Sequence, residues 1–225
     1  MRAESGTDST FATVFYEFDG CDDDVTVLQP SFQEMTVATC YAGRSVPVMH
    51  DPRPLTGEPL ALDLVDTVWV DDTGDRQDLF TDRDLRSAWL ARWGLPNTAG
   101  RAAASHLAEA RDAIRGVLER RGDPAAAAAL DAVLARGRLR LSFAGDKLEE
   151  TLEAPAAWQP AWRAARDLGR LLSQRPDRVK RCANPDCVLW FEDTTRSNTR
   201  RWCSMTGGCG SRLKARRHAA SARRG

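Results

Sequence analysis

Four cysteines near the C-terminus constrain the fold of this chain more than any other feature. They form two close pairs, C-x4-C and C-x5-C, separated by fifteen residues: Cys182, Cys187, Cys203 and Cys209. Each short pair offers two thiolates to one ion, as a tetrahedral Zn²⁺ site requires. Four thiolates placed together would repel one another strongly without a cation. The spacing therefore predicts one structural zinc ion bound by these four side chains.

The segment around the cysteines has few apolar residues, which also favours a metal. A module of fewer than fifty residues with so small a core is not expected to fold unaided, and a bound ion supplies the missing stability. The other two cysteines, Cys21 and Cys40, lie in no ligand-like pair. We expect them to be ordinary thiols.

The formal net charge is zero, but the charges are unevenly distributed along the chain. Residues 1–48 carry eight acidic and two basic side chains, whereas residues 176–225 carry four acidic and twelve basic ones. A basic segment of this kind is typical of a surface that meets a polyanion. The sequence therefore predicts that the cysteine-bearing segment contacts one.

Several signals that would indicate another class of protein are missing from the sequence. No stretch approaches the roughly twenty apolar residues of a membrane span, and no basic start followed by an apolar core marks a secretory signal. We therefore expect a cytoplasmic protein whose clustered thiols are reduced and bind metal. Neither a Gly-rich phosphate loop nor a nucleophile elbow occurs, so we do not expect an enzyme.

The hydrophobic pattern upstream of the cysteines predicts an α+β domain. Residues 60–70 mix alternation with β-branched side chains, which favours a strand. Helical spacing, with Thr81 and Asp123 as N-terminal caps, predicts four helices. They are expected over about 81–93, 98–121, 124–136 and 158–174. Alternation of Leu139, Leu141 and Phe143 with polar residues predicts a β-hairpin over 138–153 with one buried face.

These patterns divide the chain into three parts. Residues 1–50 are predicted to be an acidic, flexible extension, or to lie upstream of a true start at Met49. Residues 55–175 form the α+β domain. Residues 178–225 form the zinc module, in which 188–191 and 200–203 are expected to pair as strands before a helix from Gly210 to about Arg224. This order of knuckle, hairpin and helix is treble-clef-like.

Four short motifs lie around the cysteines: RCANPDC at 181–187, WF at 190–191, RRWCSM at 200–205 and CGSRLKARRH at 209–218. With these motifs, the zinc module resembles the CGNR zinc finger. Ser211 stands where that family has asparagine, and the second cysteine pair is one residue longer. Upstream, PLALDLVDT at 59–67 resembles the opening of the ABATE domain, although Asp66 stands where asparagine is more common. Members are stress-related bacterial transcription regulators, so the resemblance implies DNA binding.

A helix that begins at Gly210 would place several basic side chains close together, with others approaching from the preceding hairpin. Guanidinium groups suit phosphate oxygens and guanine edges because their donors form a bidentate fork. The predicted contacts with duplex DNA are Arg200, Arg201, Arg212, Lys214, Arg216, Arg217 and His218. His218 is not expected to bind the metal, because four cysteines complete the coordination shell.

Other functions remain open from the sequence. The basic segment could be a solvated tail, or the module could bind RNA or another protein. The thiolates could instead act as a redox switch that releases zinc on oxidation. The upstream domain is expected to sense a small-molecule effector or to form a homodimer, and Asp63 and Asp66 are candidates for an effector pocket.

Overall fold

The computed structural model describes residues 40–41, 44–45, 50–96, 100–204 and 208–211. The chain divides into two compact units, residues 1–48 and 49–225. In the first unit, the described residues form one antiparallel pair of short strands, β1 (Cys40–Tyr41) and β2 (Arg44–Ser45). The other residues of the extension predicted over residues 1–50, apart from residue 50, lie outside the described residues, so its predicted flexibility stays a prediction.

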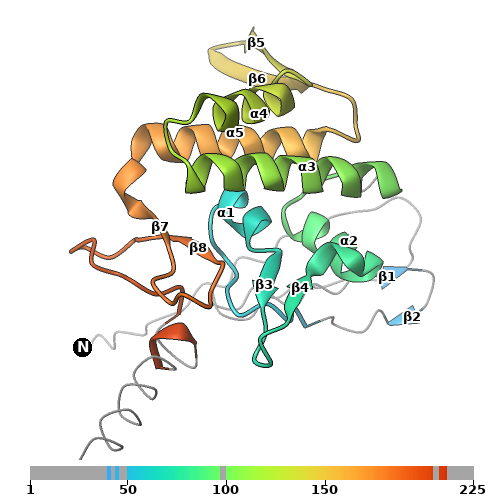
Figure 1. Ribbon diagram of the computed structural model, residues 1–225. Coiled ribbons are helices and arrows are strands. Elements are labelled where there is room, and N and C mark those ends of the chain that lie inside the picture. The colour runs from blue at the N-terminus through green and yellow to red at the C-terminus, as the bar shows by residue number, and fades with distance from the viewer. Residues whose placement is uncertain (1–39, 42–43, 46–49, 97–99, 205–207, 212–225) are drawn as a thin grey trace, which may run out of the picture. The chain divides into compact units, whose positions relative to one another are not determined.

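The second unit combines helices with small antiparallel sheets, which confirms the predicted α+β class. Its elements are α1 (Leu60–Val65), β3 (Val68–Val70), β4 (Arg76–Asp78), η1 (Leu79–Thr81), α2 (Arg83–Arg92), α3 (Gly100–Glu119), α4 (Pro124–Leu134), β5 (Arg138–Ala144), β6 (Lys147–Glu153), α5 (Gln159–Gln174), η2 (Pro176–Arg178), β7 (Val179–Arg181) and β8 (Trp190–Glu192). Helix α3 packs against α4 and α5, and α1 lies against α3 and α5 (Figure 1). Within the described ranges, the helices are all too short or too polar to cross a membrane.

The predicted strand over 60–70 is wrong in its first half, where α1 forms before β3. Most of α1 is buried, including Leu62, Leu64 and Val65. A short apolar run buried on every side shows neither helical nor strand periodicity, so its sequence does not separate the two. The position before α1 is Pro59, which supplies no side-chain cap. Instead, a carboxylate oxygen of Asp167 in α5 accepts from the Ala61 amide at 2.9 Å.

The four helices predicted upstream of the finger are confirmed as α2, α3, α4 and α5, with one change at a cap, whereas the helix predicted from Gly210 to about Arg224 lies outside the described residues beyond residue 211. Asp82, rather than Thr81, caps α2 by accepting from the backbone amides of Asp84 and Leu85. Asp123 caps α4 ahead of a proline at the first helical position, as predicted. Local sequence signals were sufficient here because a cap and its helix lie within a few residues of each other.

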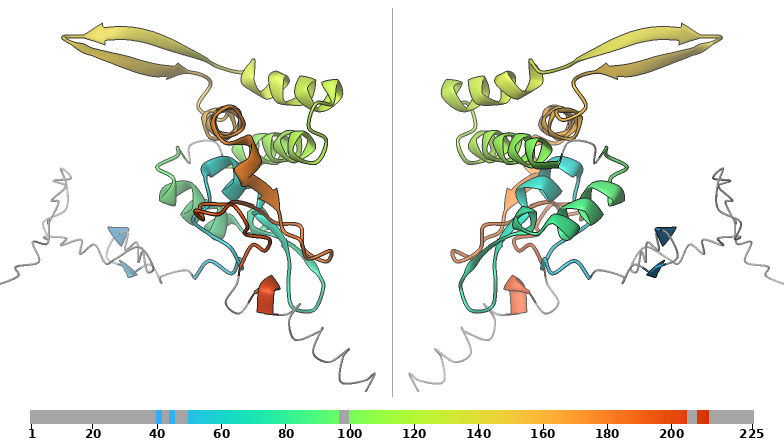
Figure 2. Two further views of the ribbon diagram at one scale, coloured as in Figure 1. Left: turned by 90° about the vertical axis from the view of Figure 1, so that its left-hand side faces the viewer. Right: turned by 90° about the vertical axis from the view of Figure 1, so that its right-hand side faces the viewer.

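The predicted hairpin is present, but its predicted buried face is not buried. Strands β5 and β6 pair in register from Arg138 with Glu153 to Ala144 with Lys147. The side chains of Leu141, Phe143 and Leu148 are 59%, 75% and 56% exposed. Figure 2 shows the hairpin projecting beyond the helices, which explains the exposure. Alternation identifies the apolar face of a strand but not whether another element covers it.

The zinc module also pairs its strands differently from the prediction. Strand β8 pairs with β7, not with residues 200–203, which form no strand. A polar centre explains the difference: the buried carboxylate of Asp193 accepts from the backbone amide of Arg200 and from the Lys180 ammonium. The Arg200 amide is therefore bonded to a side chain and does not enter a strand ladder.

The zinc module and the helical part share one hydrophobic core. Phe191 of β8 belongs to the same buried cluster as Leu62 of α1, Ile114 of α3 and Leu168 of α5. The four predicted ligand cysteines lie in this cluster as well. Residues 49–225 are thus one compact unit, in which the zinc module is packed directly on the upstream helices.

Candidate metal centre and the basic face beside it

The structure brings together the four cysteines that the sequence predicts as ligands. The sulfur atoms of Cys182, Cys187, Cys203 and Cys209 all lie within 4.8 Å of one another, and all four residues are buried. Cys182 directly follows β7, and Cys209 begins a helical turn at 209–211. Four convergent sulfurs in a buried pocket match the closed tetrahedral site of a structural zinc ion.

Backbone hydrogen bonds shape the two turns that carry the ligands. In the first turn, the Cys182 amide donates to the Leu189 carbonyl at 2.9 Å, and the Cys187 amide donates to the Asn184 carbonyl at 3.0 Å. The Asn184 side chain also donates to the Cys209 sulfur at 3.3 Å. The first turn therefore supports both its own ligands and one ligand of the second.

The second turn requires a glycine next to its last ligand. A Cβ atom at Gly208 would lie 2.5 Å from the Cβ of Ser204, closer than side-chain carbons approach each other. The Gly210 amide then donates to the Ser204 carbonyl at 3.0 Å. This close approach closes the C-x5-C pair over Ser204. The extra residue of the pair is thus accommodated at least in part by a glycine.

The sulfurs share protons when no cation balances their charge. Hydrogen bonds from the thiols of Cys187 and Cys203 lower the pKa of Cys182. Hydrogen bonding to Cys182 raises the pKa of Cys187 and of Cys203, because each thiol would give up the hydrogen bond that it donates if it ionised. A divalent cation removes this competition and allows all four sulfurs to ionise. The donor set therefore fits Zn²⁺.

These features define the class of the module: a zinc finger with four cysteine ligands. A model of the CGNR zinc finger matches residues 178–223. A second model, of the ABATE domain, matches residues 58–175 and carries the description "putative stress-induced transcription regulator". The chain belongs to the ABATE family, with a CGNR zinc finger after the ABATE domain, and it binds one structural zinc ion. No curated protein matches the chain.

Arg200, a predicted DNA contact, is fully engaged inside the finger. Its guanidinium donates to the backbone carbonyls of Trp202, Glu192 and Cys203 and lies 3.5 Å from the Glu58 carboxylate. It also stacks over a buried aromatic ring at 4.2 Å. All five N–H groups therefore have an acceptor within the protein. Arg200 holds the segment before Cys203 in place.

Arg201 and Arg181 are exposed and flank a shallow basic pocket. The pocket measures about 570 Å³ and is lined by Lys180, Arg181, Ala183, Asn198, Thr199, Arg200 and Arg201. The Arg201 guanidinium lies 5.5 Å from the ring centre of Trp202. Sequence reasoning missed Arg181, although it adjoins Cys182 in the same basic run. The other predicted contacts, Arg212, Lys214, Arg216, Arg217 and His218, lie outside the described residues.

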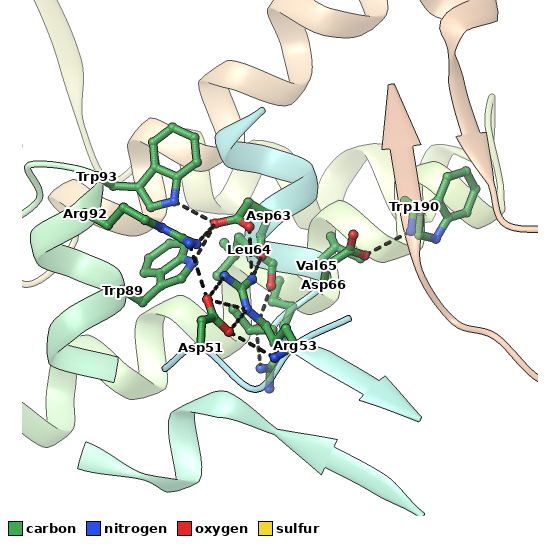
Figure 3. A network of polar contacts seen from close by, with 12 residues as sticks. Asp51, Arg53, Asp63, Leu64, Val65, Asp66, Trp89, Arg92, Trp93 and Trp190 are labelled. Carbon is green, nitrogen blue, oxygen red and sulfur yellow. Dashed lines mark hydrogen bonds and ion pairs between the residues drawn. The ribbon is translucent and has the colours of Figure 1, made fainter. Parts of the chain in front are cut away.

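Asp63, a candidate effector contact, is buried and bonded to four donors from the protein. One carboxylate oxygen accepts from Arg53 at 3.0 Å. The other accepts from Arg92 and from the indoles of Trp89 and Trp93, at 2.7 to 3.0 Å (Figure 3). Two ion pairs and two indole donors satisfy a buried carboxylate well. The network joins residues 51–53, α1 and α2.

Asp66, the second candidate, lies where the ABATE domain meets the finger. One carboxylate oxygen accepts from the Trp190 amide of β8 at 2.9 Å (Figure 3), and the other has no hydrogen-bond partner. Burial raises the pKa of Asp66 well above its usual value; the Trp190 amide opposes this, and the charges of Asp63 and Glu58 add to it. The described contacts make Asp66 a joint between two parts of the protein.

Glu58 forms a second joint of the same kind. Its carboxylate accepts from the Glu192 amide at 2.8 Å, two residues along β8 from the amide that Asp66 accepts. Arg115 of α3 adds a third link by donating to the Val188 carbonyl at 3.2 Å. Two acidic side chains thus take the place of a neighbouring strand at the free edge of β8. The finger is attached to the ABATE domain through the strand that follows its first cysteine pair.

Proposed function

We propose that this protein is a zinc-dependent transcription regulator whose finger binds duplex DNA. The description of its family concerns transcription. In addition, residues 176–225 carry twelve basic and four acidic side chains, so this segment is positively charged. The observation that supports the proposal most directly is the position of two exposed arginines beside the metal site. Arg181 immediately precedes Cys182, and Arg201 lies two residues before Cys203.

The metal would act by positioning these arginines. The Ala183 amide donates to the Arg201 carbonyl at 2.8 Å, so the backbones of the two ligand-bearing segments are in direct contact. Both arginines line the shallow pocket, and each guanidinium can donate two hydrogen bonds to a phosphate. Lys180 contributes less, because its ammonium already donates to Asp193 and Asn198. Loss of zinc would release both arginine segments together.

The proposal also covers the basic residues after Cys209. If the helical turn at 209–211 continues, Arg212 and Arg216 would fall on one face and add further phosphate or base contacts. The ABATE domain would sense an effector or pair two copies, and the joints at Asp66 and Glu58 would transmit its state to the finger. A closed four-sulfur site leaves no place for a substrate or water at the metal, which supports a non-catalytic role for the zinc ion.

The test is the salt dependence of binding to duplex DNA of random sequence, measured by fluorescence anisotropy with the zinc-loaded full chain. Each phosphate contact contributes about 0.9 to the negative slope of log affinity against log salt. Replacing Arg181 and Arg201 together by alanine should therefore reduce the slope by about 1.8. Treatment with a chelator should reduce it further by releasing the remaining contacts.

A matched control removes the same charge elsewhere. Arg163 and Arg170 are exposed on α5, so their double alanine variant should keep the slope of the wild type. A wild-type affinity that does not change with salt would refute DNA binding. Stronger binding to structured RNA than to duplex DNA at the same salt would replace this proposal with the RNA-binding one.

A further inference from the structure

An exposed apolar surface lies on the β5–β6 hairpin, which belongs to the ABATE domain and not to the finger. Among the residues described, Leu141, Phe143 and Leu148 are the large apolar side chains that are exposed, and all three belong to this hairpin. Phe143 pairs directly with Leu148, and Leu141 is two residues before Phe143. Because strand residues two apart share a face, the three side chains lie on the same face. We call this surface the hairpin face.

An ion pair attaches the hairpin to α5. Glu150, which is paired with Leu141 at the middle of the hairpin and lies on the hairpin face, contacts Arg166 of α5 at 2.6 Å. On the opposite face, Glu153 of β6 pairs with Arg138 and Arg140 of β5 at 2.7 and 3.0 Å, so these two ion pairs join the strands to each other. The hairpin projects beyond the helices (Figure 2), and Leu141, Phe143 and Leu148 remain exposed.

Both outer edges of this two-stranded sheet are unpaired among the described residues. A lone hairpin is at best marginally stable in water, and an unpaired edge beside an apolar face invites another strand. The turn at Gly145 and Asp146 has two residues, which fixes the residues of β5 that direct their backbone groups outward. These residues are Leu139, Leu141 and Phe143.

The β5 edge is complementary to itself. Antiparallel pairing of two β5 strands about Leu141 places Leu141 opposite its own copy and Leu139 opposite Phe143 of the second copy. The outward backbone groups of these residues then meet in the hydrogen-bonded positions. Arg138 and Arg140 come to lie opposite Ala144 and Ser142, so no like charges face each other. The edge thus matches in backbone, apolar side chains and charge.

The β6 edge does not match itself in this way. Antiparallel pairing about the centre of β6 places Glu150 opposite Glu150 of the second copy, and directly opposed like charges destabilise a sheet. Glu150 is also already engaged by Arg166. The two edges therefore differ: two-fold pairing about the strand centre is favourable for the β5 edge and unfavourable for the β6 edge.

We propose that two copies of this chain form a symmetric dimer by pairing their β5 strands into one four-stranded sheet. In the dimer, the hairpin face becomes continuous across the axis, and Leu141 and Phe143 pack against the partner's apolar side chains. This proposal does not rest on DNA binding. Dimerisation is a property of the hairpin, and it would also present two fingers to a site with two-fold symmetry.

The first test measures the mass of the zinc-loaded full chain by sedimentation velocity over a range of concentrations. We expect a dimer for the wild type and a monomer for Leu141→Glu, which places two carboxylates opposite each other on the axis. Leu148→Glu adds the same charge on β6, the outer strand of the proposed four-stranded sheet, and should weaken the dimer much less. One zinc per chain and an unchanged circular dichroism spectrum would show that both variants fold.

The second test uses a disulfide as a distance probe. Paired residues in hydrogen-bonded positions have Cα atoms about 5.5 Å apart, within the range that a disulfide spans. Leu141→Cys should therefore form a covalent dimer under mild oxidation, whereas Leu148→Cys and the wild type should not. A monomeric wild type would overturn the proposal. So would a dimer that survives Leu141→Glu, or equal cross-linking of the two cysteine variants.

Discussion

The two buried aspartates of the ABATE domain, Asp63 and Asp66, should respond in opposite ways to the same substitution. Asp66→Asn retains an oxygen that can accept from the Trp190 amide and removes a charge whose second oxygen has no partner. Leaving a buried polar group unsatisfied costs about 1–3 kcal/mol, and more when the group is charged. We therefore expect Asp66→Asn to raise the free energy of unfolding by about 1–3 kcal/mol at neutral pH.

The gain in stability should depend on pH, and the raised pKa of Asp66 determines the direction of that dependence. Burial raises the pKa of Asp66 in the folded state, so the folded protein keeps this proton at pH values where the unfolded chain has lost it. The contribution of Asp66 to stability is therefore complete below about pH 4 and decreases as pH rises toward the folded-state pKa. The slope is about 1.4 kcal/mol per pH unit. The variant and the wild type should be equally stable near pH 4 and diverge above it.

Urea unfolding of zinc-loaded protein, followed by tryptophan fluorescence at several pH values, measures this difference. Proton competition for the cysteine sulfurs affects both proteins equally and cancels in the comparison. Asp63→Asn is the matched control, because it leaves the buried Arg53 with a weakened partner and should lower stability by about 3–5 kcal/mol. A loss of stability in Asp66→Asn at neutral pH, or a difference that is independent of pH, would refute the reasoning.

Three further predictions concern the metal, a tight turn and an internal arginine. Elemental analysis should find one zinc per chain; Cys209→Ser should lose it and Cys21→Ser should retain it. Gly137→Ala should lower the thermal midpoint, because the added Cβ would lie 2.8 Å from another side-chain carbon, whereas Gly169→Ala, with open space in a helix, should stabilise by about 0.5–1 kcal/mol. Arg200→Ala should lower the free energy of unfolding by more than about 1 kcal/mol, since it leaves several buried acceptors unpaired; an unchanged value would contradict its internal role.

The metal site was predictable from the sequence because cysteine spacing reports ligand geometry directly. The ends of α2 and α4 were predictable within two residues, because the cap and the helix are close in sequence. The start of α1 was not, since its capping group is Asp167, more than a hundred residues away. Strand pairing in the finger failed for a related reason: the buried Asp193 takes the Arg200 amide, and no local pattern indicates this.

The interior positions of Asp63, Asp66 and Arg200 also depended on distant partners. Each reads in the sequence as a candidate for binding something outside the protein, and each is bonded to the protein itself. A charged side chain is a ligand contact or a structural joint according to what the fold places beside it. Their partners include residues that are 26, 124 and 142 positions away in the sequence.

The attachment of β8 through Asp66 and Glu58 means that the finger depends on the ABATE domain for its structure. If residues 178–225 were expressed alone, the amides of Trp190 and Glu192 would lose their acceptors and the buried Phe191 would be exposed. The structure of an isolated finger should therefore differ from that of the finger in the intact chain. Conversely, Trp190 stands three positions after the ligand Cys187. A displacement of the end of α1 would therefore be transmitted through the Asp66–Trp190 hydrogen bond to a residue within a few peptide bonds of the ion.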